Sequence, residues 1–131
     1  MAMLRRPALP MIGRMAFMLL IVEDPAQRAT RTPAEGQAVY QRMVDFAQAL
    51  KDEGTLLAVE SLASHHDAQR VQRRGGHSQV IDGPFAEAKE MIGGFFLLDV
   101  PEREQALAIA QACPAAEWAT VEVRETGPCF L

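Results

Sequence analysis

The run from Met15 to Val22 is apolar at every position, and it constrains the fold more than any other feature. Alternate residues of a β-strand point to opposite faces of the sheet, so a strand that is apolar throughout must be covered on both faces. In one domain of 131 residues, helices can cover one face. A second sheet is the economical cover for the other face, and a twin subunit would supply it. The sequence therefore predicts a homodimer that forms through its sheet.

Capping and turn signals place the other elements. Thr32 and Glu35 form a capping box around Pro33, which begins a helix that Gly54 ends. A second helix begins at Pro101-Glu102, and Pro114 ends it. Strands are expected over 15–22, 55–61, 94–100 and 118–124, with a hairpin over 69–82 that turns at Gly75-Gly76. This order predicts an α+β fold with a ferredoxin-like β-α-β-β-α-β core, both helices on one face, and an extra β-hairpin.

The chain is expected to form one domain over residues 15–125, with an N-terminal arm at 1–14 and a C-terminal tail at 126–131. Arginines before the first apolar run loosely imitate a signal peptide, but Glu23-Asp24-Pro25 follows the run where a small-residue cleavage site would be needed. No apolar run is long enough to span a bilayer. The expected location is the cytoplasm, with no membrane partner.

Composition excludes several classes of function. The net charge of −4 argues against a nucleic-acid binder, and the cluster of Arg70, Arg73 and Arg74 is typical of a solvated hairpin. Two cysteines make no disulfide framework and indicate a reducing compartment. Adjacent His65 and His66 on an extended chain would point in opposite directions, so one metal ion could not easily bind both. We expect neither a metal site nor a cofactor.

A charged turn follows the predicted hairpin. Gly83 can take a positive φ and Pro84 fixes its own φ, so the bend is tightly specified. Asp82 can accept hydrogen bonds from the backbone N–H groups after it. One interpretation is a structural turn held by a salt bridge. In the other, a carboxylate beside a lysine acts as a general base, which makes Asp82 and Lys89 candidate catalytic residues and Glu87 a candidate ligand-binding residue.

The last predicted strand alternates cleanly. If Val121 and Val123 face the helices, then Trp118, Glu122 and Arg124 face the opposite side, together with half of the first strand. Charges mixed with aromatic and aliphatic side chains are typical of a small-molecule pocket, and these three residues are candidate ligand-binding residues. The same mixture is typical of a dimer interface. The sequence leaves both interpretations open.

Several segments resemble the DGPF-type members of the YCII-related family: 17–21, 82–90, 93–100 and 120–124. The resemblance covers most of the chain, from about Met15 to about Arg124, and implies the dimeric α/β-barrel arrangement, in which a ferredoxin-like domain dimerises through its sheet. It marks Asp82 and Lys89 as characteristic polar positions without a proven role. Shorter relatives carry a His–Asp pair proposed as an acid–base dyad. Here Glu23 and Asp24 stand at the end of the first strand, where those relatives have the histidine, so the dyad is not carried over.

Two functional hypotheses follow. In the first, the chain is a homodimeric binding or accessory protein that accepts a small organic ligand in a cleft on the sheet face. A regulatory role belongs here, because the resemblance implies an association with sigma-factor-like regulators. In the second, it is a cofactor-free enzyme that performs acid–base chemistry on a small organic acid or lactone with Asp82, Lys89 or Glu122. Enzyme chemistry requires Asp82 or Glu122 to line an enclosed cleft with a second titratable group within about 3 Å.

Overall fold

A computed structural model describes residues 16–130. The arm predicted for residues 1–14 lies outside the described residues, as do Met15 and Leu131. The main elements are β1 (Phe17–Glu23), α1 (Pro33–Asp52), β2 (Leu56–Ser61), β3 (Gln69–Arg74), β4 (His77–Asp82), β5 (Met91–Leu98), α2 (Arg103–Ala112) and β6 (Thr120–Glu125). Short 3₁₀ turns join them: η1 (Arg28–Thr30), η2 (His65–Asp67) and η3 (Pro114–Glu117). No helix of residues 16–130 is long and apolar enough to cross a membrane.

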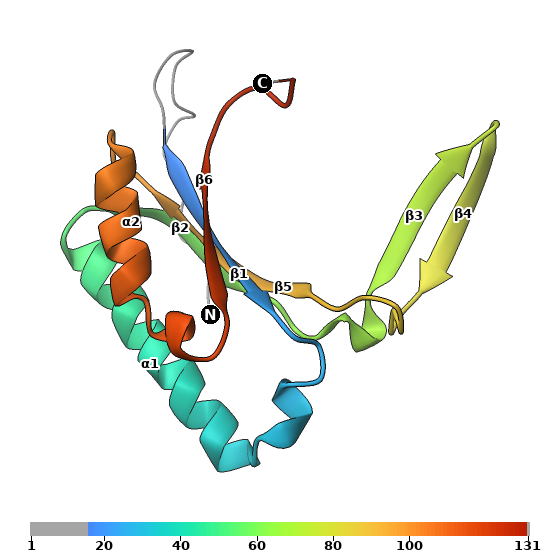
Figure 1. The fold of residues 1–131 in the computed structure, drawn as a ribbon, viewed down its shortest axis with the longest axis horizontal. Coiled ribbons are helices and arrows are strands. Elements are labelled where there is room, and N and C mark those ends of the chain that lie inside the picture. The colour runs from blue at the N-terminus through green and yellow to red at the C-terminus, as the bar shows by residue number, and fades with distance from the viewer. Residues whose placement is uncertain (1–15, 131) are drawn as a thin grey trace.

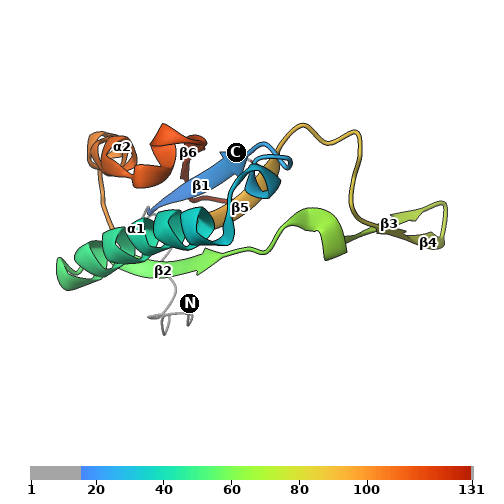
Figure 2. The same ribbon diagram turned by 90° about the horizontal axis from the view of Figure 1, so that it is seen from below.

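The four-stranded sheet has the order β2-β5-β1-β6, with every neighbouring pair antiparallel. Together with the element order, this confirms the predicted α+β, ferredoxin-like core. Both helices lie on one side of the sheet, and the β3–β4 hairpin stands clear of it on the other side (Figure 1). The second view, from below, again places the hairpin at the end of the molecule away from the helices (Figure 2).

The predicted helix start at Thr32 is confirmed. The Glu35 N–H donates to Thr32 Oγ1 at 3.1 Å, and the Thr32 N–H donates to Glu35 Oε1 at 2.9 Å. These reciprocal bonds satisfy backbone donors that the first turn of a helix leaves free. The capping box therefore fixes where α1 begins, beside the end of β1.

The core lies between the sheet and the helices. Phe17, Leu19 and Ile21 alternate along β1 with their side chains buried among those of Phe96, Leu98 and the two helices. The other face of β1 carries Met18, Leu20 and Val22, which are only half-buried in a single chain. We call this second face the open face. Its coverage by a twin subunit stays a prediction.

At the base of the β3–β4 hairpin, the structure gives a different reason for the glycine at position 83 than the one predicted from the sequence. Gly83 does not take a positive φ, unlike Gly75 and Gly76 in the hairpin turn, and the bond between Gly83 and Pro84 is cis. Glycine is required here by close approach, because a Cβ would lie 2.2 Å from the carbonyl oxygen of His65. The Gly83 N–H donates to the carbonyl of Ala68 at 2.7 Å, which ties the end of β4 back to the start of β3.

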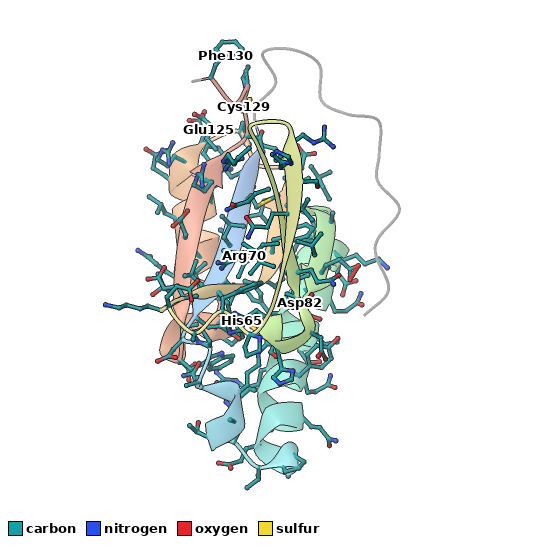
Figure 3. All side chains as sticks on the ribbon, turned by 90° about the vertical axis from the view of Figure 1, so that its right-hand side faces the viewer. His65, Arg70, Asp82, Glu125, Cys129 and Phe130 are labelled. Atoms are coloured by element: carbon teal, nitrogen blue, oxygen red, sulfur yellow. The ribbon has the colours of Figure 1, made fainter. Side chains whose placement is uncertain are left out.

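The two cysteines should differ sharply in reactivity. Cys113 is buried against the helices, and this burial raises the pKa of its thiol, whereas Cys129 is exposed in the tail beyond β6 (Figure 3). We expect a thiol reagent such as DTNB to label one cysteine rapidly in the native protein and the second only after urea is added. In Cys129→Ser the rapid phase should vanish. Rapid labelling of that variant would show that Cys113 is accessible.

Candidate functional site

The structure places the charged turn at the hairpin root, exposed to solvent. Asp82 accepts a hydrogen bond from Nε2 of Gln69 at 2.9 Å, across the hairpin, and not from the backbone that follows it as expected. Glu87 is exposed and lies 3.9 Å from Nη1 of Arg70. Lys89 is exposed and makes no hydrogen bond or ion pair with the described residues. The catalytic roles of Asp82 and Lys89 stay predictions, and the structure does not bring these groups together in an enclosed cleft.

The prediction that Trp118 shares a face with Glu122 and Arg124 is wrong. The strand begins only at Thr120, so Trp118 lies in the turn after η3. The alternation of side chains along β6 therefore does not determine which way Trp118 points. Its ring packs against the core on the helix side. Glu122 and Arg124 pair in register with Leu20 and Met18 of β1 on the open face, where their side chains lie 3.5 Å apart.

Trp118 instead lines a cavity of about 510 Å³ between α1 and the sheet, which we call the α1 cavity. The first turns of α1 and η1 form one wall, and the ends of β1, β2 and β5 form the other. Most of the lining is apolar. The lining includes Ile21, Glu23, Arg28, Arg31, Thr32, Glu60, Gly93 and Trp118.

An ion pair with a buried carboxylate lies in the wall of the α1 cavity. Glu23 is 7% exposed, and its Oε1 accepts a hydrogen bond from Nε of Arg28 at 2.5 Å. Gly93 makes room for this pair, because a Cβ there would lie 2.7 Å from Glu23 Oε2 and 3.1 Å from Arg28 Nη2. A buried carboxylate needs a charged or hydrogen-bonding partner, and Arg28 supplies both.

A second arginine lies at the same cavity, over the Trp118 ring. The guanidinium carbons of Arg31 and Arg42 lie 5.7 and 5.4 Å from the ring centroid, within cation–π range. Arg42 is held by both carboxylate oxygens of Glu117, a contact that lowers the pKa of that carboxyl. Arg31 lines the α1 cavity and Arg42 does not.

A side-chain hydrogen bond anchors the turn between β1 and α1. Gln27 donates from Nε2 to the carbonyl oxygen of Trp118 at 2.7 Å, which joins η1 to the start of β6. Its Oε1 is buried and has no hydrogen-bond partner among the described residues. A buried acceptor without a partner is uncommon in a folded domain, and many such atoms bond to an ordered water or a ligand group.

These groups suit a small organic anion. Arg28, Arg31 and the N-terminal end of α1 supply positive potential, while the lining also holds the carboxylates of Glu23, which is paired with Arg28, and Glu60. The apolar walls suit a hydrocarbon body. Across residues 16–130, no group of three or more His, Cys, Asp or Glu side chains is arranged to hold a metal ion.

The comparisons with known proteins agree with the fold. A family model described as the YCII-related domain matches residues 15–128. The chain belongs to the YCII-related family. It is also 28% identical over 97 residues to an uncharacterised protein of Rhizobium meliloti (strain 1021), a match that covers 74% of this chain and 78% of that one. The membership confirms the resemblance drawn from residues 17–21, 82–90, 93–100 and 120–124, and it brings no specific activity with it.

Sequence reasoning did not select the Glu23–Arg28 pair, although a signal was present. Glu23 is in phase with the buried Phe17, Leu19 and Ile21, at steps of two along one strand. A carboxylate that ends the buried face of a strand is itself expected to be buried and to need a cation nearby. Arg28, five residues later across a turn, is a cation within reach.

Proposed function

We propose that this YCII-related protein binds a small, largely apolar organic acid in the α1 cavity. The observation that carries the proposal is the pair formed by the buried Glu23 and Arg28, which presents a guanidinium at the wall of a mostly apolar cavity. Nε of Arg28 donates to Glu23, and the guanidinium has further N–H donors that can bind the carboxylate of a ligand. Arg31 and the first turn of α1 add positive charge on the same wall as Arg28.

The second candidate is the cofactor-free enzyme. One observation favours it: the Glu23 carboxylate forms part of the cavity wall, at the end of the first strand where the shorter relatives have their proposed acid–base histidine. A carboxylate at this position can take a proton from a bound organic acid or lactone, provided that the substrate reaches it within hydrogen-bond distance. In this candidate Glu23 is the general base and Arg28 stabilises the developing negative charge.

We also propose that the protein is a homodimer in which the open face of each sheet is covered by the other. The half-buried Met18, Leu20 and Val22 support this. They form a row of apolar side chains along one face of β1, and removing their remaining surface from water would stabilise the dimer. The link to sigma-factor-like regulators rests on family resemblance alone. A ligand in the α1 cavity would be the signal for such a regulatory role.

Arginine variants test the proposed ligand. We expect millimolar benzoate, but not benzamide, to raise the melting temperature of the wild type, because only benzoate carries the charge that the arginines recognise. Arg31→Ala should weaken benzoate binding about tenfold or more, in line with a charged hydrogen bond of ~1.5–3 kcal/mol. Thermal denaturation with and without each compound measures the first effect, and calorimetric titration measures the second.

Arg42→Ala is the matched control, because Arg42 stacks over the same Trp118 ring but lies outside the α1 cavity. Its affinity for benzoate should stay within about twofold of the wild type. The proposal fails if benzoate and a series of aliphatic carboxylates leave the melting temperature unchanged, or if both variants lose binding equally.

A further inference from the structure

The β3–β4 hairpin exposes apolar side chains away from the core. Val71 and Val80 face each other directly across the two strands and are 68% and 58% exposed. All its strand residues are exposed except Ile81, which is half-buried. A two-stranded hairpin without a packed face is marginally stable in water, so an exposed valine pair at its centre calls for a packing partner.

A groove at the base of this hairpin offers matching apolar surface. It has a volume of about 430 Å³ and includes Leu62, His65, Phe85, Glu90, Ile92 and Glu122 in its lining; we call it the root groove. Leu62 and Ile92 are themselves exposed. Of the seven large hydrophobic side chains exposed in residues 16–130, four lie on the hairpin or in the root groove. The exposed apolar surface is thus concentrated in two places that one contact could cover together.

The charges of the two places are opposite. Arg73 and Arg74 stand beside the hairpin turn and make no ion pair with a carboxylate of the described residues. Arg70, by contrast, packs at the base of the hairpin, where its guanidinium carbon lies 3.7 Å from the centroid of the Phe85 ring. The root groove carries two exposed carboxylates, Glu90 and Glu122, against one arginine in its lining, Arg70. Glu122 also lies 3.5 Å from Nη1 of Arg124, at the exposed edge of the groove.

We infer that the hairpin is an arm that clasps a second copy of this chain. In this arrangement the Val71–Val80 pair of one subunit lies in the root groove of the other. Arg73, which shares the face of Val71 because it lies two residues along β3, faces Glu90 and Glu122 of that subunit. The inference rests on the homodimer proposed above. Two-fold symmetry makes the contact twice, because each copy carries one arm and one groove.

The position of the hairpin fits this arrangement. It stands on the side of the sheet away from both helices, so a copy that covers the open face must meet the arm (Figure 1). Seen from that side, the labelled Arg70 and Asp82 lie on the hairpin in front of the sheet, with His65 near its base (Figure 3). The arm ends in a tight turn, in which Gly75 and Gly76 both take the positive φ that such a turn requires.

Charges placed on the arm test the contact. We expect V71D/V80D to raise the dimer dissociation constant at least tenfold, because two buried carboxylates would enter an apolar groove beside Glu90. Q72D/Q79D is the matched control. Gln72 and Gln79 also pair directly across the two strands, but their side chains lie on the opposite face of the hairpin from Val71 and Val80. Its dissociation constant should stay within about threefold of the wild type. Sedimentation velocity measures both, and circular dichroism checks that both variants are folded.

A charge exchange identifies the partner surface. R73E and E90R/E122R should each dimerise at least tenfold more weakly alone, since arm and groove then carry the same sign. An equimolar mixture of the two should form a heterodimer of near wild-type affinity, because both arm–groove contacts in it are again of opposite sign. A mixture as weak as its components would overturn the arm–groove pairing.

The outcomes separate the two proposals. A wild-type dimer that is unaffected by V71D/V80D overturns the arm and leaves the sheet-face dimer standing. A wild-type monomer at micromolar concentration overturns the dimer and the arm together. Benzoate binding in the α1 cavity is measured separately, and its loss or retention bears on neither result.

Discussion

Gly94→Ala is expected to destabilise the fold by about 3 kcal/mol, the upper part of the range for overpacked sites. Gly94 lies in β5, hydrogen-bonded between β1 and β2, in register with Ile21 on one side and Ser61 on the other. A Cβ there would lie 2.7 Å from the Glu60 carbonyl oxygen and 3.3 Å from the Ser61 Cα. Both neighbours are backbone atoms of β2, so no side-chain rotation relieves the contact and the two strands must separate locally. Urea unfolding measures the loss.

The matched control is Gly36→Ala, which should move stability the other way. Gly36 lies in α1, and a Cβ there would meet nothing within 4 Å. Alanine in a helix is favoured over glycine by ~0.5–1 kcal/mol, so this variant should unfold at a higher urea concentration than the wild type. If the two variants were equally stable, strand spacing at Gly94 would not be the constraint inferred from the structure.

The elements of the fold could be predicted because each has a local cause. The capping box at Thr32 fixes the start of α1, and the uniformly apolar 15–22 run predicts the strand β1. The coverage of its second face stays a prediction. Boundaries shifted where pairing decided them. The prediction started β5 at Gly94, but the strand begins at Met91, because the end of β1 continues past a bulge and pairs Glu23 with Met91.

The candidate site was harder to predict because its members meet only through the fold. Asp82 and Lys89 were predicted as a pair because their charges lie close together in the sequence. In the structure both are exposed to solvent. Glu23, Arg31 and Trp118 come from three separate segments, and nothing in their spacing shows that they border one cavity. Trp118 was also assigned by strand alternation, which does not apply to a residue before the strand begins.

Arg28→Ala is expected to destabilise the protein by about 2–3 kcal/mol. Removing one member of a buried ion pair costs ~3–5 kcal/mol, because the remaining charge is left without compensation in a poorly hydrated site. We lower the expected value because the Arg28 side chain is 32% exposed and water can screen part of the interaction. Arg42→Ala breaks a surface pair with Glu117 and should leave the urea midpoint unchanged.

A second substitution at Glu23 distinguishes the cause. If the loss in Arg28→Ala comes from the uncompensated Glu23 carboxylate, then adding Glu23→Gln should restore part of the stability, because a neutral amide costs less to bury than a charge. If Arg28 instead contributes through packing, the double variant should be no more stable than Arg28→Ala. The same pair of variants bears on ligand binding: both lack the Arg28 guanidinium, so both should bind benzoate more weakly than the wild type, whatever their stability. Unfolding in urea and calorimetric titration of the same protein samples therefore separate the structural role of Arg28 from its role as an anion receptor.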